Sequence, residues 1–174
     1  VSETGVAGAR AIGHAHGQAP RRARRAQVRG DDASSADRVV VDDVRLLLLM
    51  DVGGTMDPYY EPVSRLLTAL HEERGLRDFQ AFYFHNCVYE RVGTTADMYV
   101  KDAIPTGDIL RRLDERWKVL FVGDAAMHPA ELMNERGNIN PRHTSDTRGV
   151  DWLNRIHDHF ERCAWLNPDP PSDW

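Results

Sequence analysis

Short apolar runs alternate with amphipathic stretches along most of the chain. The run Val44–Met50 is continuous and bounded by acidic residues, which is typical of a strand buried on both faces. Further on, apolar residues recur at the spacing of one buried helix face, at Val63, Leu66, Leu67 and Leu70. Pro58 and Pro62 lie near the expected start of this helix. The pattern predicts a strand, an acidic loop and a helix as the first structural unit.

The alternation continues toward the C-terminus. The remaining expected elements are a helix from Thr106 that carries Ile109, Leu110 and Leu113, a strand at Lys118–Gly123, a short helix at Pro129–Asn134, a helix at Val150–Arg162 and a strand at Cys163–Leu166. Strands that alternate with helices are typical of a parallel sheet covered by helices on both faces.

One further pair of segments predicts antiparallel pairing. Phe79–His85 and Val88–Val92 are separated by the polar turn Asn86–Cys87, which indicates a hairpin whose second strand lies at a sheet edge. The expected fold is therefore α/β, a Rossmann-like three-layer sandwich whose central sheet is mostly parallel with one antiparallel edge strand.

The first 38 residues differ from the rest of the chain. They are rich in Ala, Gly, Arg and Ser, contain the cluster Arg21–Arg25 and show no apolar period. Such a segment lacks the apolar surface needed to offset the entropy of ordering it. We expect a flexible tail at residues 1–38, with a docking arm for an acidic partner as the alternative, and one domain at residues 39–174.

Composition and charge argue against several classes of protein. The 174 residues are 41% hydrophobic and 28% charged, as in soluble globular domains, and the net charge of −5 gives no general attraction to nucleic acid. The longest apolar run, around Leu46–Met50, is far shorter than the roughly 20 residues that cross a bilayer. Two cysteines, Cys87 and Cys163, match no zinc spacing, so reduced thiols and a cytoplasmic location are expected.

The candidate chemistry lies where strands end. Asp51 and Asp124 each follow an apolar strand, and ligands of open parallel sheets bind at the carboxyl ends of the strands. If the two strands are neighbours, two carboxylates share one cleft, which is unfavourable unless a cation or a proton lies between them. Thr55 and Thr106 add oxygen donors, and no Cys or His stands at ligand spacing. Such a set favours Mg²⁺, or else Ca²⁺ or Mn²⁺, over zinc.

These residues also carry a family resemblance. Asp51-x-Gly53-x-Thr55, then Thr106 at the head of a helix, then Asp124 after a strand, resembles the metal-ion-dependent adhesion site of von Willebrand factor type A (VWA) domains. The segments LLLLMDVGGTMDP, FYFHNCVYERV, VLFVGDAAMHPAEL and WLNPDPPSDW are similar to the CoxE-like bacterial subfamily. The resemblance covers roughly residues 40–174.

The resemblance implies a ligand set. Asp51 and Asp124 are expected near the ion, often through water, with Thr55 and Thr106 supplying hydroxyl ligands and a partner protein supplying a carboxylate. Gly53 departs from the usual motif, which has a hydroxyl residue there, so water replaces one ligand or the affinity falls. A metal-free loop with solvated aspartates is the alternative.

The resemblance also implies a role. CoxE-like proteins are associated with MoxR-type AAA+ ATPases and with metalloenzyme maturation, so the expected function is a non-enzymatic, cation-dependent adaptor. The VWA fold has six strands, and about five are found in the pattern, so a truncated C-terminus after Trp174 is expected.

The main alternative function is enzymatic. An apolar strand followed by Asp-x-Gly-Gly-Thr also resembles the first phosphate loop of sugar kinases, which would make the protein a phosphoryl transferase. That fold requires a second antiparallel strand after the loop, whereas a helix is expected here. A catalytic Cys87–His85 pair would require an activated thiolate, and a simple turn is the preferred interpretation.

Overall fold

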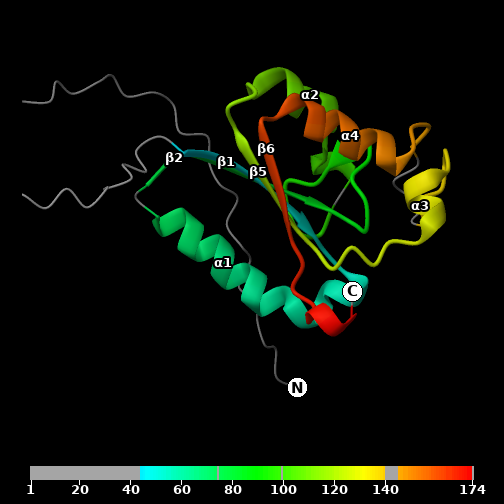
Figure 1. Ribbon diagram of the computed structural model, residues 1–174, viewed down its shortest axis with the longest axis horizontal. Helices are drawn as coiled ribbons and strands as arrows, with labels where there is room; N and C mark the ends of the chain where they lie inside the picture. The colour runs from blue at the N-terminus through cyan, green and yellow to red at the C-terminus, as the bar shows by residue number, and fades with distance from the viewer. Residues whose placement is uncertain (1–43, 74, 99, 140–144, 174) are drawn as a thin grey trace, which may run out of the picture. The chain divides into compact units, whose positions relative to one another are not determined.

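Four parallel strands form the central sheet of the computed structural model, which describes residues 44–73, 75–98, 100–139 and 145–173. The strands lie in the order β2-β1-β5-β6, and every neighbouring pair is parallel (Figure 1). Their bounds are Val44–Asp51 for β1, Leu76–Phe84 for β2, Lys118–Val122 for β5 and Arg162–Leu166 for β6. The expected tail at 1–38 and the expected start of order at Val39 lie outside the described residues.

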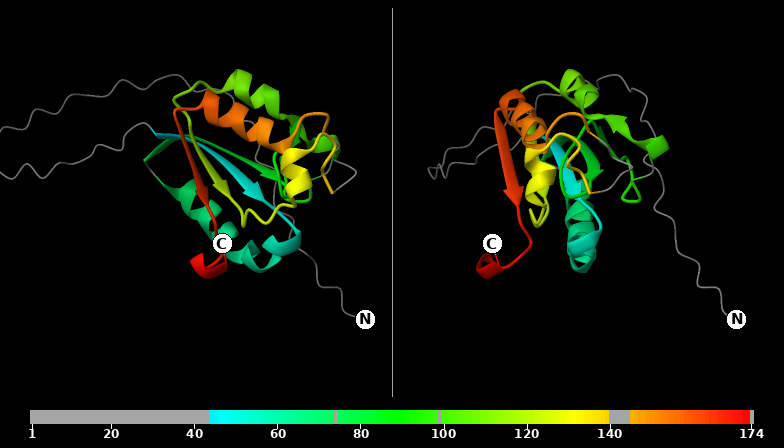
Figure 2. Two further views of the ribbon diagram at one scale, coloured as in Figure 1. Left: turned by 45° about the vertical axis from the view of Figure 1, so that its right-hand side comes forward. Right: turned by 90° about the vertical axis from the view of Figure 1, so that its right-hand side faces the viewer.

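Helices connect the strands as the periodicity predicts. They are α1 (Tyr60–Glu72), α2 (Thr106–Arg112), α3 (Pro129–Met133) and α4 (Gly149–His159), with short 3₁₀ turns η1 (Gly54–Tyr59), η2 (Val100–Asp102) and η4 (Pro171–Asp173). Helix α1 covers one face of the sheet, and α2 and α4 cover the other (Figures 1 and 2). The α/β architecture is thus confirmed. Among the described helices, none has both the length and the apolar character of a bilayer span.

The predicted hairpin is wrong. β2 pairs in parallel with β1 along its length, from Val44–Leu76 to Asp51–Phe84, and the returning chain makes only a single bridge between Tyr83 and Gly93. Among the described residues, apart from isolated bridges, antiparallel pairing occurs in a separate small sheet of β3 (Arg91–Val92) and β4 (Ile104–Pro105), so the four-stranded sheet has no antiparallel edge strand.

The physical reason is that both faces of β2 carry apolar side chains that reach the core. Phe82 and Phe84 pack on the face under α2 and α4, whereas Phe79, Ala81 and Tyr83 pack on the face under α1. Both faces of β2 are therefore covered by helical layers, as is typical of a strand in a parallel α/β sheet, although β2 lies at one edge of the order β2-β1-β5-β6.

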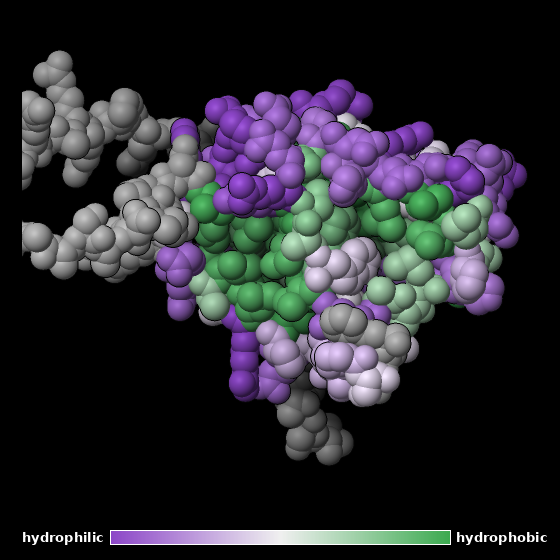
Figure 3. Space-filling model, viewed as in Figure 1, coloured by the Kyte–Doolittle hydropathy of each residue, from purple (hydrophilic) through white to green (hydrophobic). Residues whose placement is uncertain are grey.

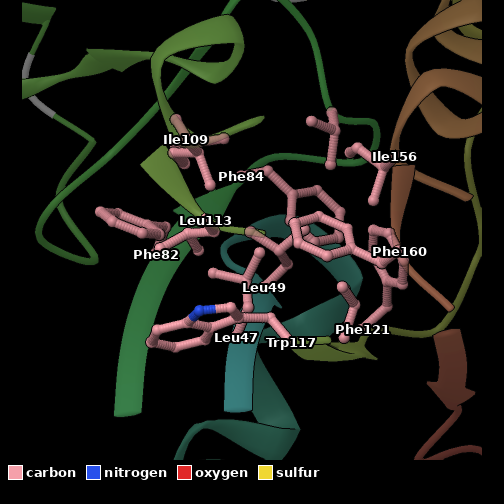
Figure 4. Close-up of a cluster of buried hydrophobic side chains, with 13 residues drawn as sticks. Leu47, Leu49, Phe82, Phe84, Ile109, Leu113, Trp117, Phe121, Ile156 and Phe160 are labelled. Atoms are coloured by element: carbon pink, nitrogen blue, oxygen red, sulfur yellow. The ribbon is translucent and has the colours of Figure 1, made fainter. Parts of the chain in front are cut away.

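The main core lies between the sheet and the pair α2 and α4. Aromatic rings make several of its contacts: Phe84 meets Phe121 edge to face with centroids 6.5 Å apart (Figure 4), and Phe121 stacks on the partly buried Trp165 at 5.0 Å. Such rings contribute large buried areas, so this layer fixes the strands relative to one another.

The opposite layer is thinner. Leu48, Met50 and Val122 are fully buried there, but no residue of α1 is, and Leu166 of β6 stays 46% exposed. In the view of Figure 3, apolar residues gather over the strands between α1 and the upper helices, whose outer surfaces are polar.

Candidate functional site

The carboxyl ends of the four strands form one edge of the sheet, here called the carboxyl rim. It carries Asp51 at the end of β1, His85 and Asn86 after β2, Asp124 after β5 and Asn167 after β6. From β1 the chain crosses to β2 on one side, and from β5 it crosses to β6 on the other. The strand order therefore reverses between β1 and β5, which is where open α/β sheets bind ligands.

Asp51 is held at this reversal point. It is 3% exposed, and its Oδ1 accepts the backbone N–H of Asn86 at 2.9 Å. Burial raises the pKa of Asp51 to about 7; the Asn86 N–H lowers it in part, and the charge of Asp124 raises it further. The carboxyl group therefore lacks the compensation that an ionised group needs at this depth.

Gly123 allows β5 to approach Asp51 closely. A Cβ at residue 123 would lie 2.8 Å from the Asp51 Cβ and 3.3 Å from its Oδ2. No side chain fits in that space. Glycine at this position thus lets the two strand ends, and with them the two aspartates, lie side by side.

Asp124 is oriented by its own turn. Its Oδ1 accepts the N–H of Ala126 at 3.0 Å, and its backbone carbonyl accepts the side-chain amide of Asn167 at 3.0 Å. The intervening Ala125 has a positive φ of 57°, as the tight turn requires. Asp124 is 8% exposed, so both aspartates of the rim are largely withdrawn from solvent.

The loop after Asp51 turns sharply beside His85. Gly53 has φ 82° and Gly54 has φ 59°, conformations that favour glycine. A Cβ at residue 53 would lie 3.6 Å from Cε1 and Nδ1 of the His85 ring. Thr55 follows within η1 and is exposed, so its hydroxyl is accessible at the rim.

Thr106 has a different environment. It is 2% exposed at the start of α2, and its hydroxyl donates to the carbonyl of Tyr89 at 2.5 Å. Among the described residues no hydrogen bond joins Thr106 to Asp51 or Asp124. Its oxygen keeps lone pairs, but the bond to Tyr89 gives this side chain a structural role of its own.

The donor set fits a hard divalent cation in part. Of the five residues proposed from the sequence, Asp51 and Asp124 are brought together, Thr55 lies on the adjoining loop, Gly53 offers no side chain, and Thr106 is bonded to Tyr89. In the described portion of the chain, no three His, Cys, Asp or Glu side chains converge at metal-binding spacing. The pair of buried carboxylates is the feature that fits a cation.

Sequence reasoning missed two structural supports of the rim. Asn86, with φ 58°, presents its N–H to Asp51 and donates its side-chain amide to both carboxylate oxygens of Glu131 at 3.2 and 3.1 Å. Glu131 is 1% exposed and also accepts the N–H of His128 at 3.0 Å and that of Ile139 at 3.4 Å. The spacing from His128 to Glu131 is that of a helix-capping pair, which is the one local signal available.

The segment of His85 and Cys87 is a turn, as expected. The two residues form an isolated antiparallel bridge, and the His85 ring bonds to the Val52 carbonyl at 2.7 Å. Burial raises the pKa of the Cys87 thiol to about 12, and the nearby Glu131 and Asp51 charges raise it as well. A thiolate nucleophile is therefore strongly disfavoured at this position.

Comparison of the chain with known proteins identifies no relative. No family model, curated protein or solved structure matches the chain. The function of this chain is therefore inferred from the residues of the carboxyl rim.

Proposed function

We propose that the chain is a divalent-cation-dependent protein-interaction domain without enzymatic activity. Asp51 and Asp124 hold the cation, Thr55 contributes a hydroxyl, and an acidic side chain of a partner protein completes the coordination. A bound dication supplies an incompletely neutralised positive charge that attracts and orients the partner's carboxylate.

The observation that carries the proposal is the pairing of two buried carboxylates at the reversal of strand order. Among the described residues, no Arg or Lys side chain pairs with either carboxylate, and the pKa of Asp51 is raised to about 7 by burial and by Asp124. A dication removes both penalties at once, because it neutralises the mutual repulsion and replaces the lost hydration.

The resemblance to CoxE-like VWA proteins supports a narrower form of the proposal. In that form the domain is an adaptor that presents a client to a MoxR-type AAA+ ATPase during maturation of a protein or metalloenzyme. Mg²⁺ is the cation that the sequence favours, with Mn²⁺ or Ca²⁺ as alternatives.

The connectivity disfavours the phosphoryl-transfer alternative. A sugar-kinase-like phosphate loop joins two antiparallel strands, whereas β1 leads through η1 into α1, and both neighbours of β1 are parallel to it. The Gly53–Gly54 turn therefore lies in a strand-to-helix connection and not in a hairpin.

The test is partner capture under metal control. Wild-type protein and the Asp51→Asn variant are immobilised, and binding of acidic client peptides or of an AAA+ ATPase is measured with Mg²⁺, with Mn²⁺ and with chelator. We expect capture that requires metal and is lost in the variant. Capture that is equal with and without chelator contradicts the proposal.

A further inference from the structure

Asn86 contacts two buried carboxylates, each through a different group. Its backbone N–H donates to Oδ1 of Asp51 at 2.9 Å, and its side-chain amide donates to both oxygens of Glu131, at 3.2 and 3.1 Å. Both carboxylates are almost fully withdrawn from solvent, so water does not readily replace either contact. One residue that follows β2 thus connects the end of β1 to α3.

The backbone conformation of Asn86 allows both contacts. Its φ of 58° lies in the left-handed region, where asparagine is enriched over most other residues that carry a Cβ. The N–H of Cys87 donates to the carbonyl of His85 at 2.7 Å, so Asn86 is the central residue of a three-residue turn. From the centre of this turn the N–H reaches Asp51 and the side-chain amide reaches Glu131.

The bond from Asn86 determines how the Asp51 carboxylate is turned. Oδ1 of Asp51 accepts this bond, which comes from the residue after β2. Oδ2 faces β5, because a Cβ on Gly123 would lie 3.3 Å from it, and Asp124 is the next residue. Strands β2 and β5 flank β1 on opposite sides. The Asn86 N–H therefore directs Oδ2 toward the strand end that carries Asp124.

The Glu131 carboxylate holds the Asn86 side chain in place. It also accepts the N–H of His128 at 3.0 Å and that of Ile139 at 3.4 Å, and the bond from His128 completes the capping box of α3. Hydrogen bonds to an ionised acceptor are stronger than those between neutral groups. Rotation of the Asn86 side chain would leave a buried carboxylate with fewer donors, which is costly.

We infer that Asn86 is a positioning residue: its side-chain amide, held by Glu131, fixes the backbone N–H that orients the Asp51 carboxylate toward Asp124. The orientation is a property of the chain without any ligand. Its effect on ligand binding rests on the proposed function, in which Asp51 and Asp124 hold a cation. Removal of such an outer support typically lowers metal affinity by about 10- to 100-fold.

The test removes the side-chain amide and keeps the backbone donor. Asn86→Gly retains the N–H and tolerates the positive φ, but it has no amide for Glu131. Glu131→Gln weakens the same contact from α3 and leaves Asn86 intact. Arg136→Gly is the matched control, because exposed Arg136 also has a positive φ, of 56°, and its N–H donates to the Ser145 carbonyl at 2.8 Å. The full-length chain is used, and urea denaturation establishes the conditions in which each variant is folded.

Two measurements are made on the folded proteins. Amide hydrogen exchange without metal reports the bond from residue 86 to Asp51, and titration calorimetry with Mn²⁺ reports the affinity of the proposed site. We expect Asn86→Gly to lower the protection of the residue 86 amide roughly tenfold, since a hydrogen bond to a carboxylate is loosened. The Mn²⁺ affinity should fall on the order of 10-fold. Glu131→Gln changes both quantities in the same direction, and Arg136→Gly changes neither.

Two outcomes overturn the inference and leave the proposed function intact. If the residue 86 amide is as protected in Asn86→Gly as in wild type, the side chain does not hold the N–H on Asp51. If Mn²⁺ binds wild type and Asn86→Gly equally, the orientation of Asp51 has no part in ligand binding. If wild type binds no Mn²⁺, the proposed function fails, whereas a loss of protection in Asn86→Gly still supports Asn86 as the residue that orients Asp51.

Discussion

Two buried carboxylates, Glu131 and Asp51, have opposite surroundings although a single residue connects them. Glu131 accepts the side-chain amide of Asn86 and the N–H groups of His128 and Ile139, so its desolvation is compensated. Asp51 accepts the backbone N–H of Asn86 and faces the charge of Asp124. The first is arranged for stability, whereas the second carries an uncompensated cost that a ligand can relieve.

The largest loss of stability is expected when the Glu131 carboxylate is removed. Glu131→Ala removes the acceptor for three donor groups in a buried position, so we expect a loss of about 3 to 5 kcal/mol in the free energy of unfolding. Urea denaturation measures it, with the exposed Glu61→Ala of α1 as the control. A loss below about 1 kcal/mol would show that the network around Asn86 contributes little.

The Asp51→Asn substitution is expected to increase the free energy of unfolding at pH 8. The pKa of Asp51 is raised from 3.8 to about 7, so the unfolded chain ionises first, and stability is lost as the pH rises from about 4 to 7. Without metal, the variant is expected to be more stable than wild type at pH 8, by about 2 to 4 kcal/mol, and equal to it near pH 3.5. Denaturation of both proteins across this range gives the difference. A variant less stable than wild type at pH 8 would make Asp51 a structural residue like Glu131.

Thr106→Val distinguishes a structural residue from a metal ligand. The sequence predicts Thr106 as a ligand, whereas in the structure its hydroxyl bonds to the Tyr89 carbonyl. Loss of its bond to the Tyr89 carbonyl leaves a buried acceptor, so we expect a stability loss of about 1 to 2 kcal/mol. The loss in metal affinity should be smaller than that caused by Asp51→Asn. Titration calorimetry measures both metal affinities. Equal losses of affinity in the two variants would place Thr106 in the cation site.

Thr55→Ala gives the smallest change in stability. The side chain is exposed and has no hydrogen-bond partner among the described residues, so the expected change lies within about 0.5 kcal/mol. The metal affinity, in contrast, should fall, since a hydroxyl ligand is removed. An unchanged affinity would remove Thr55 from the proposed ligand set.

The sequence predicts most elements of this fold because their hydrophobic periods are strong. The run Val44–Met50 and the helical spacing from Val63 to Leu70 admit one interpretation each, and Asp51 and Asp124 follow directly from the strand ends. The pattern also predicts the strand at Phe79–His85, but its expected antiparallel partner is wrong. In the structure β2 pairs in parallel with β1, and the returning chain bridges it only at Tyr83–Gly93.

The place of His85 on the rim depends on the neighbour of β2. The sequence predicts the strand Phe79–His85 without identifying β1 as its neighbour, and the observed parallel pairing with β1 places His85 at the same rim as Asp51. Glu131 is hidden for another reason. Only its bond to the N–H of His128 follows a local capping pattern, whereas its contact with Asn86 is made by tertiary structure, and no local pattern in a sequence predicts that contact.

The most direct test of the shared cation is an anomalous diffraction experiment on crystals grown with Mn²⁺. We predict a single strong anomalous peak between the carboxylates of Asp51 and Asp124, absent from crystals of Asp51→Asn. Well-ordered crystals in which both aspartates are clear and no peak lies between them, or in which Mn²⁺ binds elsewhere and equally in the variant, would contradict the account.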